Sequence, residues 1–306
     1  MIEYPFIERL PYAFPVVPEL MLLWHFTIVA VGLCVGSFLN VCIWRLPRGE
    51  SVVTPHSHCP KCGRRIVWHE NIPVLSYLLL RGRCAGCKLS ISPRYMCVEL
   101  LTAALFWLVW WRVTGRHQPL PALLPCLTLT AILVATFFID LEHYIIPDAL
   151  TFTGALSGLA FAFFFPQIWG IDLGGLAGRG LALSNSAAGL VAGGGVMAAF
   201  SIGGRMLLKQ DALGWGDVKL VAAIGALFGL VPAAWFFTIL VGSVFGVAAG
   251  AVLALAGRGK AENGKKVIPF GPCLALAAYL WILYGPELSA AYFAWSRPAL
   301  QRLLGL

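Results

Sequence analysis

Long apolar segments recur along most of this 306-residue chain. Hydrophobic residues make up 59% of it and charged residues only 12%, whereas a soluble domain carries about 25% charged residues. A helix of about 20 apolar residues crosses the hydrocarbon core of a bilayer, and helices satisfy their own backbone hydrogen bonds there. The predicted fold is therefore an all-α polytopic membrane protein. About eight segments are expected to span the membrane: 20–43, 96–113, 120–139, 149–165, 185–203, 217–231, 233–256 and 267–285.

Small residues cluster in the fifth to seventh of these segments. Examples are Ala192–Gly195 and Gly242–Gly246. Small side chains let membrane helices approach each other closely, because lipid provides no hydrophobic drive for their association. These stretches therefore suit close helix packing.

Basic residues are distributed unevenly between the two membrane faces that eight spans define. Sixteen Lys and Arg residues fall on one face and six on the other. Because Lys and Arg favour the cytoplasmic side, loops 44–95 and 257–266 are predicted to be cytoplasmic. The segments 1–19 and 286–306 are then extracytoplasmic, and 20–43 is an uncleaved first span. The net charge of +8 reflects this topology, so we do not expect nucleic-acid binding.

Two cysteine pairs stand out in the predicted cytoplasmic loop, Cys59-x2-Cys62 and Cys84-x2-Cys87. This spacing is typical of a tetrahedral four-cysteine zinc site. Four protein ligands would leave no position for water, so such a site would be structural. Gly63 and Gly86 would help the chain turn around the metal. Redox or disulfide chemistry and a metal-free loop are the alternatives, the former disfavoured by a reducing cytoplasm.

Two aspartates lie where predicted spans meet the cytoplasmic face. Asp140 ends one apolar segment, and Asp217 begins another within Gly-Trp-Gly-Asp. Ionisable residues in or beside membrane spans are costly and usually functional. An acid at a helix C-terminus also opposes the helix dipole, so Asp140 lacks a structural explanation. Asp148 has one, because it follows Pro147 at a helix start, where an acid complements the dipole.

Two neighbouring carboxylates can share one proton and perform aspartic-protease chemistry. The residues therefore predict Asp140 and Asp217 as a catalytic pair. A proton-coupled transporter using the same aspartates is the main alternative, although the sequence has no visible inverted repeat of broken helices. A non-catalytic assembly factor with a zinc loop is a second alternative, but it would not need two acids at one depth.

The motifs together resemble those of the type IV prepilin peptidases, which are bifunctional leader peptidases and N-methyltransferases. The resemblance runs nearly end to end and rests on Gly36–Val41, Arg45–Pro47, both cysteine pairs, Ser92–Tyr95, Val98–Thr102, Asp140, Ile146–Asp148, Gly214–Lys219 and Ile268–Pro272.

The resemblance implies that Asp140 and Asp217 are the catalytic acids of a G-x-G-D membrane aspartyl protease. Such an enzyme cleaves the leader of prepilins and type II secretion pseudopilins after a glycine, then methylates the new N-terminus with S-adenosylmethionine. It implies a bacterial inner-membrane protein whose partners are these substrates and membrane lipid. It also implies a methylation-associated loop 44–95 and a peptidase core 96–285. No glycine-rich cofactor loop is visible. Arg45, Arg94 and Glu99 could contact cofactor or substrate, but the two arginines could equally anchor lipid headgroups, so all three are left unassigned.

Overall fold

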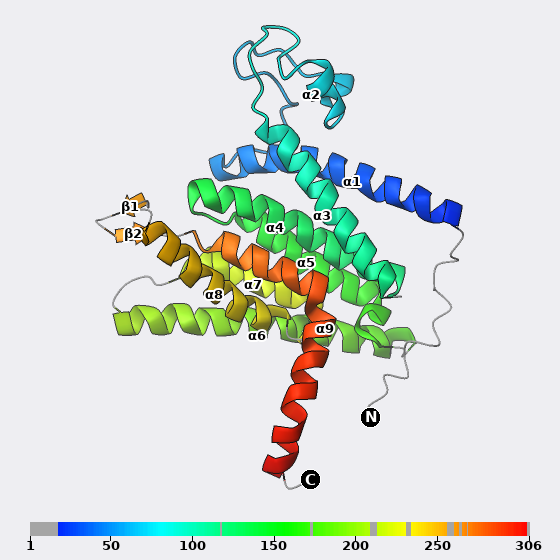
Figure 1. The fold of residues 1–306 in the computed structure, drawn as a ribbon, viewed down its shortest axis with the longest axis vertical. Helices are drawn as coiled ribbons and strands as arrows, with labels where there is room; N and C mark the ends of the chain where they lie inside the picture. The colour runs from blue at the N-terminus through cyan, green and yellow to red at the C-terminus, as the bar shows by residue number, and fades with distance from the viewer. Residues whose placement is uncertain are drawn as a thin grey trace. The chain divides into compact units, whose positions relative to one another are not determined.

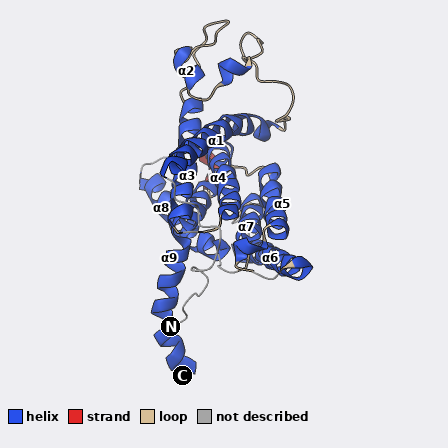
Figure 2. Cartoon of the chain, turned by 90° about the vertical axis from the view of Figure 1, so that its right-hand side faces the viewer, coloured by secondary structure: helices blue, strands red, loops and turns tan. Residues whose placement is uncertain are grey.

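The computed structural model describes residues 18–116, 118–171, 174–208, 213–230, 234–255, 260–262, 265–267 and 269–304. Helices dominate these residues (Figure 2). The chain divides into two compact units, Met1–Leu150 and Thr151–Leu306.

The helices follow one another along the chain, and a long loop that contains α2 joins α1 to α3 (Figure 1). Unit 1 contains α1 (Pro18–Arg45), α2 (Leu75–Leu79), α3 (Arg94–Gly115), α4 (Leu123–His143) and the first residues of α5 (Asp148–Phe164). Unit 2 contains the rest of α5, α6 (Gly175–Leu208), α7 (Trp215–Phe228), α8 (Ala234–Leu255) and α9 (Gly271–Leu304). An antiparallel hairpin of β1 (Lys260–Glu262) and β2 (Lys265–Val267) connects α8 to α9. Short 3-10 helices occupy Leu46–Arg48, Trp68–Asn71, Leu120–Ala122 and Pro166–Trp169.

The multi-pass helical fold is confirmed, but the number of eight spans is not. A helix coincides with each expected segment, yet only six helices within the described ranges are long and apolar enough to cross a membrane. The other two, α5 and α7, have 17 and 14 residues. At about 1.5 Å per residue they fall short of a hydrocarbon core about 30 Å thick.

The ends of the chain differ in how far the structure describes them. Residues 1–17 and parts of the loop 257–266 lie outside the described residues. The segment 286–306, expected as a tail, continues α9 as far as Leu304. Figure 1 shows this helix changing direction along its length, and Pro286 within it cannot donate a backbone hydrogen bond. The division into a loop domain and a peptidase core 96–285 stays a prediction.

In unit 1, α1 packs directly on the backbone of α3. A Cβ atom added at Gly32 would lie 2.6 Å from the Cα atom of Ala103, and one at Gly36 would lie 2.7 Å from the Cα atom of Glu99. Behind this contact, Trp110 of α3 and Leu129 of α4 are fully buried. The two glycines therefore allow α1 to approach the start of α3, which is where the loop between these helices is attached.

In unit 2, the small residues of α6 bring its backbone against α7. A Cβ atom at Gly189 would lie 2.2 Å from the carbonyl oxygen of Gly225. The Ser186 hydroxyl, fully buried, donates a 2.6 Å hydrogen bond to the carbonyl of Ala226. Gly193, in one of the stretches expected to pack closely, also approaches α7, because an added Cβ atom would lie 2.8 Å from the carbonyl oxygen of Val221, whereas Gly195 meets no described atom within 4 Å.

Large apolar side chains also cover the outer surfaces of the helices. Leu22, Leu23 and Phe26 of α1 are 60–67% exposed, and Leu255 of α8 is 90% exposed. Soluble proteins rarely expose extended apolar surfaces of this kind. Contact with lipid tails accounts for them.

We expect Gly189→Leu to destabilise unit 2, because the new side chain would overlap the backbone of α7. Overpacking typically costs about 1–3 kcal/mol. Thermal unfolding of the detergent-purified protein should show a lower midpoint. The matched control is Gly195→Leu on the same helix, where an added Cβ atom would meet no described atom within 4 Å. Equal midpoints for the two variants would contradict this packing.

Candidate active site and metal site

The loop between α1 and α3 folds into two turns that repeat one hydrogen-bonding pattern around the cysteine pairs. In each, the N–H of the first cysteine donates to the carbonyl five residues later, and the N–H four residues later donates back to the cysteine carbonyl. These bonds are 2.9 and 2.9 Å long at Cys59, and 2.8 and 3.0 Å long at Cys84. The fourth residue after the first cysteine of each pair has a left-handed backbone conformation, with φ of 67° at Gly63 and 58° at Lys88.

Gly86 is not the left-handed residue of the second turn. That conformation belongs to Lys88, and Gly86 is needed instead for space. A Cβ atom at Gly86 would lie 3.2 Å from Cδ of Arg64 and 3.7 Å from Sγ of Cys62. The two turns therefore face each other across this glycine.

The four cysteine sulfurs meet at one point of the loop. The Sγ atoms of Cys59, Cys62, Cys84 and Cys87 all lie within 4.8 Å of one another, and those of Cys59 and Cys87 are 3.7 Å apart. A tetrahedron with zinc–sulfur bonds of about 2.3 Å has sulfurs about 3.8 Å apart. The cluster predicted from the spacing is thus formed, and it could hold a metal ion.

The sulfurs differ in how readily they lose a proton. The backbone N–H groups of Cys62 and Lys61 lower the pKa of Cys59 to about 6. At Cys87 the N–H of Leu89 favours the thiolate, but burial and the other three cysteines outweigh it and raise the pKa to about 11. Four thiolates this close would repel one another strongly. A bound divalent cation would favour all four in the deprotonated state.

Two arginines hold the loop in its folded form. The buried guanidinium of Arg45, at the end of α1, donates to the carbonyls of Ser51 at 2.9 Å and Pro55 at 2.7 Å. Arg64, in the first cysteine turn, pairs with Glu70 at 2.9 Å. The hydrogen bond from Arg64 keeps the pKa of Glu70 below its ordinary value. Arg45 therefore has a structural role as an anchor of the loop.

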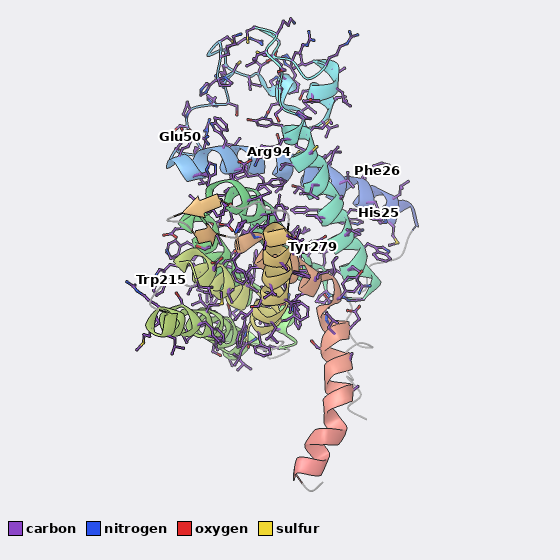
Figure 3. The ribbon with its side chains drawn as sticks, turned by 60° about the vertical axis from the view of Figure 1, so that its left-hand side comes forward. His25, Phe26, Glu50, Arg94, Trp215 and Tyr279 are labelled. Atoms are coloured by element: carbon purple, nitrogen blue, oxygen red, sulfur yellow. The ribbon has the colours of Figure 1, made fainter. Side chains whose placement is uncertain are left out.

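The start of α3 is fixed by contacts to both neighbouring helices. The Asn40 amide of α1 donates a 2.9 Å hydrogen bond to the carbonyl of Tyr95. Arg94, which Figure 3 labels, forms an ion pair with Glu142 at the end of α4 and lies over the Phe138 ring at 5.2 Å. These contacts set the position from which the loop returns to the membrane.

Asp140 lies in the last turn of α4 and is only 6% exposed. The helix ends at Tyr144, whose N–H donates to the Asp140 carbonyl at 3.0 Å and whose φ is 59°. Asp148 and Glu142 are exposed. Of the three acids in this segment, Asp140 is thus the buried one, which fits its choice as the functional candidate.

Asp217 lies in the first turn of α7 and is 8% exposed. Its N–H donates to the carbonyl of Gly214 at 3.2 Å. A Cβ atom at Gly214 would lie 3.3 Å from Oδ2 of Asp217. The first glycine of Gly-Trp-Gly-Asp therefore leaves room for the carboxylate.

The structure brings the cysteines together but does not test the pairing of the aspartates. Asp140 belongs to unit 1 and Asp217 to unit 2, so their pairing stays a prediction. Sequence reasoning left Glu99 without a role. This acid of α3 is only 8% exposed. Its signal in the sequence was an ionisable residue inside an apolar segment.

The fold and the loop define a multi-pass α-helical membrane protein with a four-cysteine cluster and buried acids at helix ends. Two family models match it: the Bacterial Peptidase A24 N-terminal domain over residues 30–113, and the Type IV leader peptidase family over residues 127–251. No solved structure matches this chain.

Characterised relatives match over most of their length. A protein of Aeromonas salmonicida is 35% identical over 298 residues, covering 88% of this chain and 94% of the relative. A protein of Pseudomonas aeruginosa is 34% identical over 292 residues, which cover 86% of this chain and 91% of the relative. One of Myxococcus xanthus is 42% identical over 226 residues, covering 74% of this chain and 62% of the relative. Each is named prepilin leader peptidase/N-methyltransferase. The chain belongs to the type IV leader peptidase family.

Proposed function

We propose that this protein is a membrane aspartic endopeptidase that removes the leader of type IV prepilins and type II secretion pseudopilins after a glycine. It then methylates the new N-terminal residue. The observation that carries this proposal is the likeness to prepilin leader peptidase/N-methyltransferases over 94% of one relative's length. None of the comparisons supports the alternative of a proton-coupled transporter.

Asp140 and Asp217 are the peptidase dyad in this proposal. One carboxyl, protonated, donates a hydrogen bond to the scissile carbonyl, and the other, ionised, takes a proton from the attacking water. Peptide-bond cleavage then needs a proton delivered to the leaving amine, which the protonated member of the pair can supply. Their burial at helix ends supports these roles, because close carboxylates in a low dielectric resist ionising together.

The loop supplies the second activity. When bound, S-adenosylmethionine provides a methyl group that the new N-terminal amine takes up as the carbon–sulfur bond breaks and the amine loses a proton. The four cysteines would hold a structural Zn²⁺, and because all four ligands would come from the protein, the metal would stabilise the loop rather than take part in either reaction.

The enzyme acts at the cytoplasmic face of the bacterial inner membrane. The division of basic residues that eight spans would give, sixteen to six, supports this orientation. A substrate whose hydrophobic helix lies in the same bilayer would present the bond that follows its leader at this boundary. Membrane lipid and the pilin substrates are therefore its expected partners, and nucleic acid is not.

The topology gives a direct test. In a cysteine-free background, a cysteine placed at Glu50 should resist an impermeant thiol reagent added to intact cells. It should react once the membrane is permeabilised, because loop 44–95 is expected to face the cytoplasm. Ready labelling in intact cells would invert the proposed orientation.

The metal can be tested by replacing Cys59 and Cys62 with serine. The wild-type chain should carry one zinc ion, measured by mass spectrometry of the purified protein, and the double variant should carry none. Loss of two of four thiolates removes most of the binding energy of such a site. Serine in place of Cys34, a thiol outside the cluster, is the control and should keep the metal. Stoichiometric zinc in the double variant would refute the site.

The dyad can be tested with purified protein, one prepilin and labelled S-adenosylmethionine, with cleavage and methylation scored separately. Asp140→Asn and Asp217→Asn should each abolish cleavage, and the double variant should be no worse, because the two act as one unit. Both should still methylate a pilin supplied without its leader. The wild-type pH–rate profile should be bell-shaped, as expected for coupled carboxyls.

Asp148→Asn is the matched control, because this exposed acid lies eight residues from Asp140 at the start of the next helix. It should retain substantial cleavage activity. Near wild-type cleavage by either dyad variant would show that the mechanism is wrong.

A further inference from the structure

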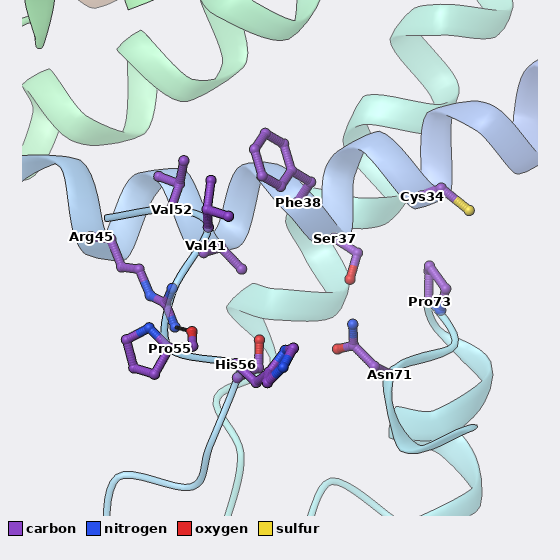
Figure 4. A pocket seen from close by; sticks show the side chains of 12 residues that line it. Cys34, Ser37, Phe38, Val41, Arg45, Val52, Pro55, His56, Asn71 and Pro73 are labelled. Atoms are coloured by element: carbon purple, nitrogen blue, oxygen red, sulfur yellow. Dashed lines mark hydrogen bonds between the residues drawn. The ribbon is translucent and has the colours of Figure 1, made fainter. Parts of the chain in front are cut away.

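Unit 1 contains a cavity between the cysteine turns, the end of α1 and the start of α3. Its volume is about 560 Å³, within the range of sites that bind small molecules. An adjoining hollow of about 350 Å³ lies along α1 (Figure 4), and the two share Ser37, Arg45 and Asn71 among their lining residues. Cys59 and Cys84 form part of the wall of the larger cavity, so the fold of the cysteine cluster determines its shape.

Glu99 lines this cavity as a buried acid without a basic partner. Its Oε2 accepts a 2.7 Å hydrogen bond from the N–H of Val74, and no ion pair to it is found within the described ranges of the chain. Three arginines line the cavity: Arg45 donates to loop carbonyls, Arg64 pairs with Glu70, and Arg65 makes no ion pair with Glu99 within the described residues. Arg94, close by at the start of α3, pairs with Glu142. A buried carboxylate without a cation is costly, so a cationic ligand would be favoured here.

The residue that Glu99 contacts has a strained backbone. Val74 has φ of 61° and ψ of −49°, which a β-branched residue rarely adopts. It directly precedes α2, and Pro73 beside it lines the adjoining hollow. Strain of this kind persists where the surroundings enforce it, and it is concentrated at ligand sites. Glu99 thus connects the strained turn to the cavity.

The remaining walls suit an aromatic ring. Tyr77 and Tyr95 line the cavity, and the Tyr77 hydroxyl is held by a 3.3 Å hydrogen bond to the carbonyl of Ile91. Aromatic side chains can stack on a purine, whereas the Glu99 carboxylate would repel a phosphate. The combination favours a nucleoside that carries a positive charge in place of phosphates.

We propose that this cavity binds S-adenosylmethionine and that the Glu99 carboxylate faces its sulfonium. The inference rests on the proposed methyltransferase function. The ends of two membrane helices form the floor of the cavity, so a donor bound there lies at the depth at which a membrane-embedded substrate presents its new N-terminus. The zinc cluster then has a defined purpose, since it shapes one wall of the site.

The test compares the donor with its product, S-adenosylhomocysteine, which lacks the positive charge on sulfur. Both are titrated by calorimetry into the purified, zinc-loaded full chain without pilin. Glu99→Gln keeps an oxygen that can accept from the Val74 N–H but removes the charge. The substitution should lower the affinity for S-adenosylmethionine about tenfold or more and leave the affinity for S-adenosylhomocysteine within about threefold of wild type.

Asp148→Asn is the charge-matched control. Asp148 is exposed and lines neither the cavity nor the adjoining hollow, so both affinities should stay within about threefold of wild type. Zinc content and thermal unfolding check that each variant is folded. Equal affinity changes for the two ligands in Glu99→Gln, or no change in either, would overturn the assignment. If wild-type protein cleaves and methylates pilin while this result is obtained, only the cavity inference fails. If wild-type protein binds neither ligand and does not methylate, the methyltransferase proposal fails with it.

Discussion

The absence of water from the bilayer core is the constraint from which the architecture follows. Backbone groups there must bond within helices, and helices must pack without a hydrophobic drive. The chain meets the second condition with glycine: Gly32 and Gly36 bring α1 onto α3, and Gly189 meets Gly225 between α6 and α7. The same constraint favours ionisable groups at helix ends over helix centres. Asp140 closes α4 and Asp217 opens α7, which is the placement that the proposed peptidase function uses.

The loop between α1 and α3 has the opposite difficulty, because it lies outside the membrane and is too small to bury a core. Within the described loop, its helical content is limited to α2 and the turns Leu46–Arg48 and Trp68–Asn71. Small domains of this kind usually depend on metals or disulfides for stability. Here two cysteine turns with the same hydrogen-bonding pattern converge on one cluster. Arg45, at the end of α1, holds the loop through hydrogen bonds to its backbone. A metal at the cluster would therefore stabilise the part of the cavity wall that Cys59 and Cys84 form.

Much of this could be predicted from sequence, for identifiable reasons. Hydropathy depends on local composition, so the positions of the helices were predictable, and Cys-x2-Cys spacing directly encodes a ligand set. Helix length was less predictable: α7 ends before Gly229, whose φ of 78° the apolar pattern does not reveal. The left-handed backbone at Lys88 rather than Gly86 was also not predictable. Gly86 is needed for space against the opposite turn, and the sequence does not reveal that contact. Glu99 could not be assigned, since its partner Val74 is separated from it by 25 residues.

The arrangement also separates the two chemistries along the chain. The cysteine cluster, Arg45, Val74 and Glu99 all fall within residues 30–113, the part that matches the A24 N-terminal domain. Asp140 and Asp217 fall within residues 127–251, the part that matches the leader peptidase family. The ends of α1 and α3 border the cavity, and α4, which carries Asp140, packs on the same two helices. In the proposed function, disrupting the loop would remove methylation without removing either carboxylate, and cleavage comes first because it creates the amine to be methylated.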